Sequence, residues 1–166
     1  DTYCQEKRSP LQDFYKEYFP KQTQVSSVKF VGISLTFVSQ IPESFYLCKE
    51  LRNLFPNAFF MLGGPCLHQI LMSAEEKTLR KIFSYVDAVC VAEGEETLSQ
   101  ILPVVSQWKQ TPDAASRLSL LKNIPNLLFW DEMKEKTCTS PSWIADLKES
   151  AIPDFTDLDL DRYLAP

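Results

Sequence analysis

The chain has 166 residues, of which 45% are hydrophobic and 23% are charged, and this composition is typical of one folded domain. Its net charge of −5 excludes the strongly basic surface by which most proteins bind nucleic acids or anionic membranes. Apolar stretches such as 86–92 are far shorter than the roughly 20 residues of a membrane span, so we expect a cytoplasmic protein with no membrane or nucleic-acid partner.

The cysteines and the single histidine exclude the common metal and disulfide frameworks. There are five cysteines, and no two of them have the spacing of a zinc ribbon or a redox Cys-x-x-Cys motif. Their odd number argues against a secreted disulfide framework. His68 is the only histidine, which excludes a histidine pair for zinc within this chain. We therefore predict no metal site and expect most cysteines to be small buried hydrophobes.

The first third of the chain predicts a helix and then a buried strand. The helix is expected over 9–19, because Ser9 and Pro10 suit a helix start and five following residues are spaced for one apolar face. These residues are Leu11, Phe14, Tyr15, Tyr18 and Phe19. The run 28–35 is short, β-branched and almost wholly apolar, as is typical of a strand buried on both faces.

Alternating helices and strands continue through the middle of the chain. Apolar residues at steps of three and four predict an amphipathic helix from Ile41 to Phe55, which Pro56 ends. Strands are expected over 57–62 and 86–91. Between them, Ser73 and Glu76 have the spacing of a capping box, which predicts that a helix starts there. Further helices are expected from Leu98 to Trp108 and over 114–122.

The last third has a different character. Segments 126–130 and 136–140 predict a β-hairpin, and 152–161 alternates acidic and apolar residues, as is typical of an extended arm. The repeated strand–helix order before them predicts right-handed crossovers and a parallel sheet of the α/β class. We accordingly divide the chain into an N-terminal helical segment (1–27), an α/β domain (28–122), and a hairpin with a linker (123–166).

The four glycines mark one edge of this predicted sheet. Gly32 lies near the end of the first strand, Gly63 and Gly64 follow the second, and Gly94 follows the third. Ligands of open α/β sheets bind at the carboxyl ends of the strands, which is this edge. For Gly63 and Gly64 we favour close approach of the backbone to a ligand, and for Gly32 an ordinary strand–helix turn.

Three motifs at this edge carry a resemblance to a known family. They are Ser34-Leu35-Thr36, then after 26 residues Gly63-Gly64-Pro65, and then Ala92-Glu93-Gly94-Glu95-Glu96-Thr97. Together with the hairpin and the arm, their order and spacing resemble the cobalamin-binding domain of cobalamin-dependent radical S-adenosylmethionine enzymes, over residues 28–166. In that family a further strand–helix unit precedes the first motif, so we expect a flavodoxin-like sheet that is incomplete at its N-terminus.

The resemblance implies a site that binds the nucleotide tail of cobalamin. It implies hydrogen bonds from the hydroxyls of Ser34 and Thr36, and a backbone at Gly63 and Gly64 that passes the tail without a Cβ clash. The implied cofactor-binding residues are Ser34, Leu35, Thr36, Gly63, Gly64, Pro65, Glu93, Gly94 and Glu95. No catalytic residue is expected, and Glu95 and Glu96 are read as first-turn acids that suit a helix dipole.

The sequence departs from related patterns in three places. His68 follows the Gly-Gly turn, and no Asp-x-His-x-x-Gly motif occurs, so we interpret His68 as a solvent-facing or helix-start residue. The lower face of a bound cobalt would then be supplied by water, by a residue other than histidine, or by a segment outside this chain. Ala92 replaces a common glycine, and Asn126 replaces another, a mild change because asparagine tolerates left-handed backbone.

The chain also lacks the Cys-x3-Cys-x2-Cys motif that binds a [4Fe–4S] cluster and leaves one iron for S-adenosylmethionine. We expect those cofactors in an adjoining radical S-adenosylmethionine domain, with methyl transfer as the reaction of the whole enzyme. Two alternatives stay open: a degenerate scaffold that keeps the fold, binds no cobalamin and acts as an interaction domain, and another flavodoxin-like nucleotide or signalling domain. Against the second alternative, the sequence lacks the phosphate loop of a flavin site.

Overall fold

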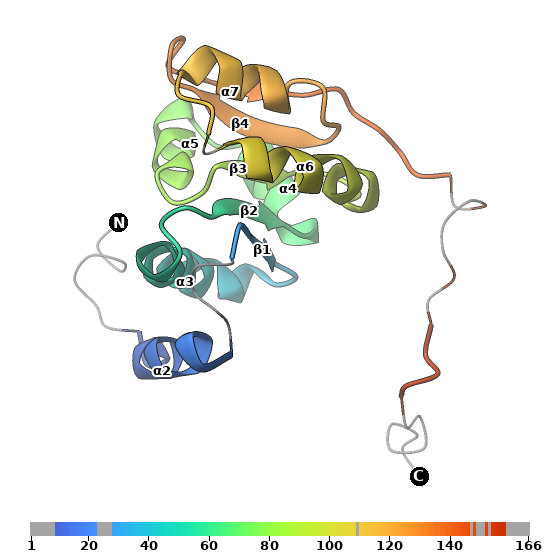
Figure 1. Ribbon diagram of the computed structural model, residues 1–166. Helices are drawn as coiled ribbons and strands as arrows, with labels where there is room; N and C mark the ends of the chain where they lie inside the picture. Colours follow the sequence, from blue (N-terminus) through green and yellow to red (C-terminus); the bar gives the residue numbers. More distant parts are fainter. Residues whose placement is uncertain are drawn as a thin grey trace.

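Five strands form one open sheet in the computed structural model, which describes residues 9–22, 28–108, 110–146, 148, 152 and 154–158 (Figure 1). In sheet order they are β1 (Phe30–Ser34), β2 (Phe59–Gly63), β3 (Ala88–Cys90), β4 (Leu127–Asp131) and β5 (Lys136–Thr139). The first three are parallel, and β4 and β5 form an antiparallel hairpin that continues the sheet from β3. The predicted α/β class, parallel sheet and hairpin are confirmed.

Helices cover both faces of the sheet in a Rossmann-like arrangement (Figure 1). One face packs against α3 (Ile41–Leu54), α4 (Pro65–Met72) and α5 (Glu76–Phe83). The other packs against α6 (Glu95–Trp108) and α7 (Ala114–Leu121). A short 3-10 turn, η2 (Val38–Gln40), precedes α3, and α2 (Gln12–Gln22) packs on α3 outside these layers.

The alternation of side chains along β2 divides the core in two. Phe60 and Leu62 pack among α3, α4 and α5, whereas Phe59 and Met61 pack among α6 and α7. All four side chains are buried, and each contributes roughly 1.5–3 kcal/mol through the apolar surface that it removes from water. Since helices cover both faces of this strand, its sequence is continuously apolar. Burial on both faces was predicted for the strand at 28–35, and this prediction is wrong, because Gly32 and Ser34 of β1 are exposed.

The segment after β2 differs from the prediction. A helix that the sequence did not predict, α4, begins at Pro65 directly after the glycine pair. Ser73 ends this helix, with its Oγ 3.2 Å from the carbonyl oxygen of Ile70, and the residue that precedes α5 is Glu75. The capping-box interpretation of Ser73 and Glu76 is therefore wrong, because the serine hydroxyl bonds backward to its own helix.

The N-terminal helix is also different from the prediction. It forms, but Leu11, Phe14 and Tyr18 are exposed, so the expected apolar face is not buried as a whole. Tyr15 is the residue of this set that is fully buried, against α3. Among the described residues, no helix is both long and apolar enough to cross a membrane. Cys4, and positions 153 and 159–161 of the expected arm, lie outside the described residues.

Candidate functional site

A groove with a volume of about 690 Å³ lies at the carboxyl edge of the parallel strands. It extends along the faces of β1 and β2 and reaches the loop between β3 and α6. Its lining residues are Phe30, Gly32, Ile33, Ser34, Met61, Gly63, Gly64, Pro65, His68, Cys90, Val91, Ala92, Glu93, Gly94 and Leu98. Its volume falls within the roughly 300–1,000 Å³ that ligand pockets occupy.

The groove follows from the way the helices cover the sheet. Helices α6 and α7 pack with the β3 and β4 side chains, and in the described structure the same face of β1 remains accessible. Phe30, Gly32 and Ser34 share that face because side chains alternate along a strand. A Cβ at Gly32 would lie 2.9 Å from Cε1 of Phe30. Gly32 is therefore a groove residue in the middle of β1, and its interpretation as a strand–helix turn was wrong.

Ser34 and Gly63 are neighbours across the edge of the sheet. They are partners in the parallel ladder between β1 and β2, so a hydroxyl-bearing side chain stands beside a residue without one. Both residues line the groove, and Ser34 is exposed. The sequence motifs thus bring together a hydroxyl and a side-chain-free backbone at the edge where ligands of open α/β sheets bind.

The two glycines of the pair have different reasons to be glycine. A Cβ at Gly64 would lie 2.3 Å from the carbonyl oxygen of Leu35, and the φ of Gly64 is 107°. A Cβ at Gly63 would lie 3.6 Å from Cβ of Cys90, an ordinary contact. Close backbone packing against Leu35 therefore accounts for glycine at position 64, which differs from the predicted role of making room for a ligand.

The loop between β3 and α6 forms the other border of the groove, and Asn126 holds it. The Nδ2 of Asn126 donates to the carbonyl oxygens of Glu93 and Trp143, both at 3.0 Å, and its Oδ1 accepts from the Trp143 amide at 2.8 Å. The φ of Asn126 is 59°, which confirms the expected left-handed backbone. The Glu93 carboxylate accepts from the Ala145 amide at 3.4 Å, so loop and C-terminal arm are bonded together.

Six of the nine predicted site residues line the groove. They are Ser34, Gly63, Gly64, Pro65, Glu93 and Gly94. The other three, which the sequence placed in the site, do not line it. Leu35 is 1% exposed and belongs to the core, and Glu95 is an exposed residue of the first turn of α6. Thr36 lies in the loop after β1, where its amide donates to the side-chain oxygen of Gln40 at 3.0 Å.

Sequence reasoning missed the apolar walls of the groove and one of its polar residues. Phe30, Met61 and Leu98 provide the apolar surface. The alternation along β1 was a signal for Phe30, since Ser34 lies four residues later on the same face. His68 stands in the first half of α4, as expected of a helix-start residue, and it also lines the groove, which the sequence did not predict.

The ring of His68 is held by the backbone. Its Nδ1 lies 2.6 Å from the carbonyl oxygen of Val91, the residue that follows β3. A carbonyl oxygen only accepts, so this contact assigns a hydrogen to Nδ1. In the neutral ring, Nε2 then carries the lone pair.

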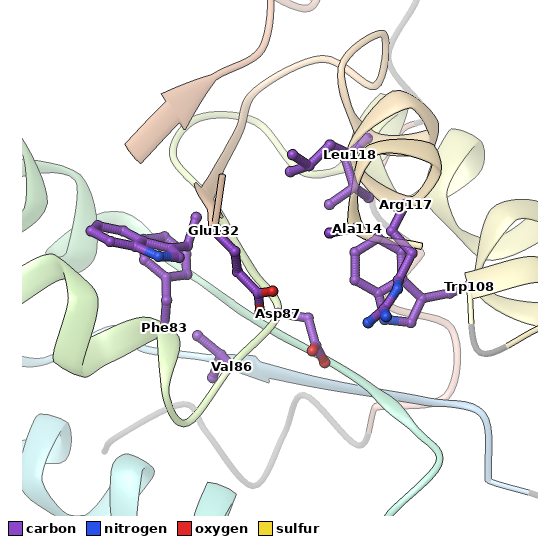
Figure 2. A pocket seen from close by; sticks show the side chains of 10 residues that line it. Phe83, Val86, Asp87, Trp108, Ala114, Arg117, Leu118 and Glu132 are labelled. Carbon is purple, nitrogen blue, oxygen red and sulfur yellow. The ribbon is translucent and has the colours of Figure 1, made fainter. Parts of the chain in front are cut away.

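A second hollow, of about 110 Å³, lies near the amino end of β3, beside Val86 and Asp87 (Figure 2). Asp87 and Arg117 contribute to its lining, and the Asp87 carboxylate accepts from the Phe60 amide at 2.8 Å and from Arg52 at 3.1 Å. This volume is below the usual range for ligands, so the larger groove is the candidate site. Within the described part of the chain, no three side chains of His, Cys, Asp or Glu come together as a metal site.

Comparisons with known proteins agree with only part of the expectation. No protein-family model matches the chain. The chain is 27% identical over 135 residues to PH0819 of Pyrococcus horikoshii, which is named as an uncharacterized methyltransferase. The match covers 81% of this chain and 26% of PH0819, so the chain spans about a quarter of the length of this relative.

Proposed function

We propose that this chain is the cobalamin-binding module of a radical S-adenosylmethionine methyltransferase, and that the groove accepts the nucleotide tail of cobalamin. The observation that carries this proposal is the pairing of Ser34 with Gly63 at the border of an open groove. The similarity to a protein named as a methyltransferase supports the reaction class of the whole enzyme. The substrate of the whole enzyme, the [4Fe–4S] cluster and the adjoining radical S-adenosylmethionine domain belong to the same proposal.

The residues of the groove fit the chemistry of the tail. Phe30, Met61 and Leu98 offer an apolar surface for a flat heteroaromatic base. The Ser34 hydroxyl both donates and accepts hydrogen bonds, which suits ribose and phosphate oxygens. Gly32 and Gly63 keep the groove free of side chains between these two regions. The groove therefore offers an apolar surface and a polar border, as the two ends of a nucleotide require.

The role that follows for this chain is binding and orientation. Cobalamin, when bound, supplies a cobalt centre that carries the methyl group, and the protein residues position it. We propose no catalytic role for the groove residues.

Spectroscopic titration with hydroxocobalamin tests the proposal. We expect the purified chain to shift the visible spectrum of hydroxocobalamin and to co-elute with it in gel filtration. Gly32→Val places a branched side chain in the groove, and we expect it to weaken binding at least tenfold. Ser34→Ala removes one neutral hydrogen bond, about 1 kcal/mol or roughly fivefold in affinity.

Ser106→Ala is the matched control for the loss of a hydroxyl, because Ser106 is exposed on α6 and bonds to the Pro103 carbonyl. It should leave the affinity unchanged. Circular dichroism and thermal unfolding identify variants that fail to fold. An unchanged spectrum and no co-elution with the folded wild type would reject cobalamin binding and favour the scaffold hypothesis.

A further inference from the structure

We infer that Nε2 of His68 is the protein ligand that this chain presents to the cobalt of a cobalamin bound in the groove. This inference rests on the proposed function and adds a residue to it. It also replaces the expectation that a ligand other than histidine would serve the cobalt.

The first reason is the orientation of the ring. The 2.6 Å contact between Nδ1 of His68 and the Val91 carbonyl fixes both the ring position and the hydrogen on Nδ1. Histidines that bind metals commonly donate their second ring N–H to a carboxylate or a backbone carbonyl in this way. His68 therefore already has the backbone partner that a metal-binding histidine needs, and its remaining nitrogen carries the lone pair.

The second reason is that the other donor atoms of the groove are engaged or weak. Cys90 is only 4% exposed, and its Sγ lies 3.5 Å from the Ala92 carbonyl and 3.6 Å from the Thr97 hydroxyl. The Glu93 carboxylate accepts from the Ala145 amide. Ser34 offers a neutral hydroxyl. Among these side chains, the imidazole of His68 is the exposed nitrogen donor suited to a transition metal.

The third reason is the number of ligands. A free zinc ion needs three or four protein ligands, and the described residues hold no cluster of three. Cobalt in a corrin ring would bring nitrogen ligands of its own, so one protein side chain would be enough. A single oriented histidine beside a groove of this size therefore suits a metal that brings its own macrocycle.

Electron paramagnetic resonance of bound cob(II)alamin tests the inference directly. An axial nitrogen splits the cobalt lines by its nuclear spin, into triplets for ¹⁴N and doublets for ¹⁵N. Because His68 is the only histidine among the 166 residues, labelling with ¹⁵N-histidine marks this one side chain in a tag-free chain. We expect triplets in the unlabelled complex and doublets after labelling.

Two variants complete the experiment. In His68→Gln the nitrogen splitting should disappear while cobalamin still co-elutes, because the tail contacts remain. In His68→Gly, added ¹⁵N-imidazole should restore the doublets.

Each contrary result has one meaning. Triplets that persist after labelling would show that the nitrogen is not that of His68, and this would overturn the role of His68. Unsplit lines from a bound complex would also overturn that role and leave the proposed function standing. If the folded chain binds no cobalamin, both the proposed function and this inference fail.

Discussion

Gly63 and Gly64 are adjacent, yet the structure places different steric demands on them. The backbone of Gly64, with φ 107° and ψ 157°, lies in a region that essentially only glycine adopts. Its missing side chain leaves space for the backbone of Leu35, whereas Gly63 faces the groove beside Cys90. Gly63 thus borders the groove without steric constraint, and Gly64 holds together the backbone on which the groove depends.

Alanine at each position separates the two roles. We expect Gly64→Ala to lower the free energy of unfolding by at least about 3 kcal/mol, because the backbone strain and the clash with Leu35 act together. Gly63→Ala, with only an ordinary contact, should cost about 1 kcal/mol or less. Urea unfolding curves measure both changes. Equal stability of the two variants would contradict this account.

Asn126 combines an unusual backbone conformation with three side-chain hydrogen bonds, and two substitutions distinguish them. Asn126→Gly keeps the left-handed backbone and loses the bonds, whereas Asn126→Ala loses both. We expect both to destabilise the chain, and alanine to cost about 1 kcal/mol more than glycine. Both should speed hydrogen exchange of the Trp143 amide, which the Asn126 side chain now protects. Unchanged exchange at Trp143 would show that the hydrogen bonds of the Asn126 side chain do not hold the arm.

At the scale of elements, one carboxylate of α3 accepts hydrogen bonds from two hydroxyls at α2. Oε1 of Glu43 accepts from the Ser9 hydroxyl at 2.6 Å and from the Tyr15 hydroxyl at 2.8 Å. Burial of the ring, together with the Glu43 charge, raises the pKa of Tyr15 well above its ordinary value. The phenol therefore stays a donor to Glu43 at every pH at which the protein is ordinarily handled.

Glu43→Ala should release α2 without unfolding the sheet. We expect faster hydrogen exchange over 12–22, since the two hydroxyls lose their shared acceptor, and little change in the strands. Glu17→Gln is the control, because Glu17 forms an exposed pair with Lys21 at 3.8 Å, and such pairs contribute little. Mass spectrometry of deuterated peptides resolves the two regions. Equal acceleration in the strands would mean that α2 is part of the cooperative core.

The elements also show what the sequence could predict and what it could not. Short apolar runs between turn residues predicted the strands and the hairpin correctly. Burial on both faces accounts for this pattern in β2 and β3, but not in β1, where Gly32 and Ser34 are exposed. Helix α4 was missed because Ser73 was interpreted as the start of the next helix, from its spacing to Glu76. In the structure Ser73 ends α4, and its hydroxyl bonds back to Ile70. Local spacing alone does not distinguish a residue that ends one helix from a residue that begins the next.

The candidate site was predictable to the extent that its residues lie at strand ends. Ser34 and Gly63 were found in this way, since parallel strands bring their carboxyl ends to one edge. Phe30 and Leu98 were not found, because their exposure to the groove depends on how far α6 extends across the sheet. That position is set by packing between distant residues such as Ile101 and Phe59, which no local pattern encodes.

At the scale of the whole molecule, stability should fall in alkaline solution. Burial raises the pKa of the Cys48 thiol from 9.0 to about 12, with a smaller contribution in the opposite direction from Arg52. The unfolded chain loses this proton near pH 9, whereas the folded chain retains it. The contribution of the thiol to stability is therefore complete below pH 9 and decreases as the pH rises toward 12.

Cys48→Ala isolates this effect from other titrations. The stability difference between wild type and variant should decrease by about 2 kcal/mol between pH 9 and 10.5, at about 1.4 kcal/mol per pH unit. Urea unfolding at several pH values measures it, with the constant cost of the smaller side chain visible at pH 8. A difference that does not depend on pH would show that Cys48 is accessible to hydroxide.

The bonds of Asn126 and Glu93 have a consequence for any enzyme that contains this fold. The loop beside the groove and the chain that leaves the sheet share a side chain, so neither changes conformation alone. A ligand that displaces this loop would therefore also displace the departing chain, and such linkage acts equally in both directions. A protein body attached beyond the arm would then sense whether the groove is occupied, and its own docking would tighten or loosen the hold on the bound molecule.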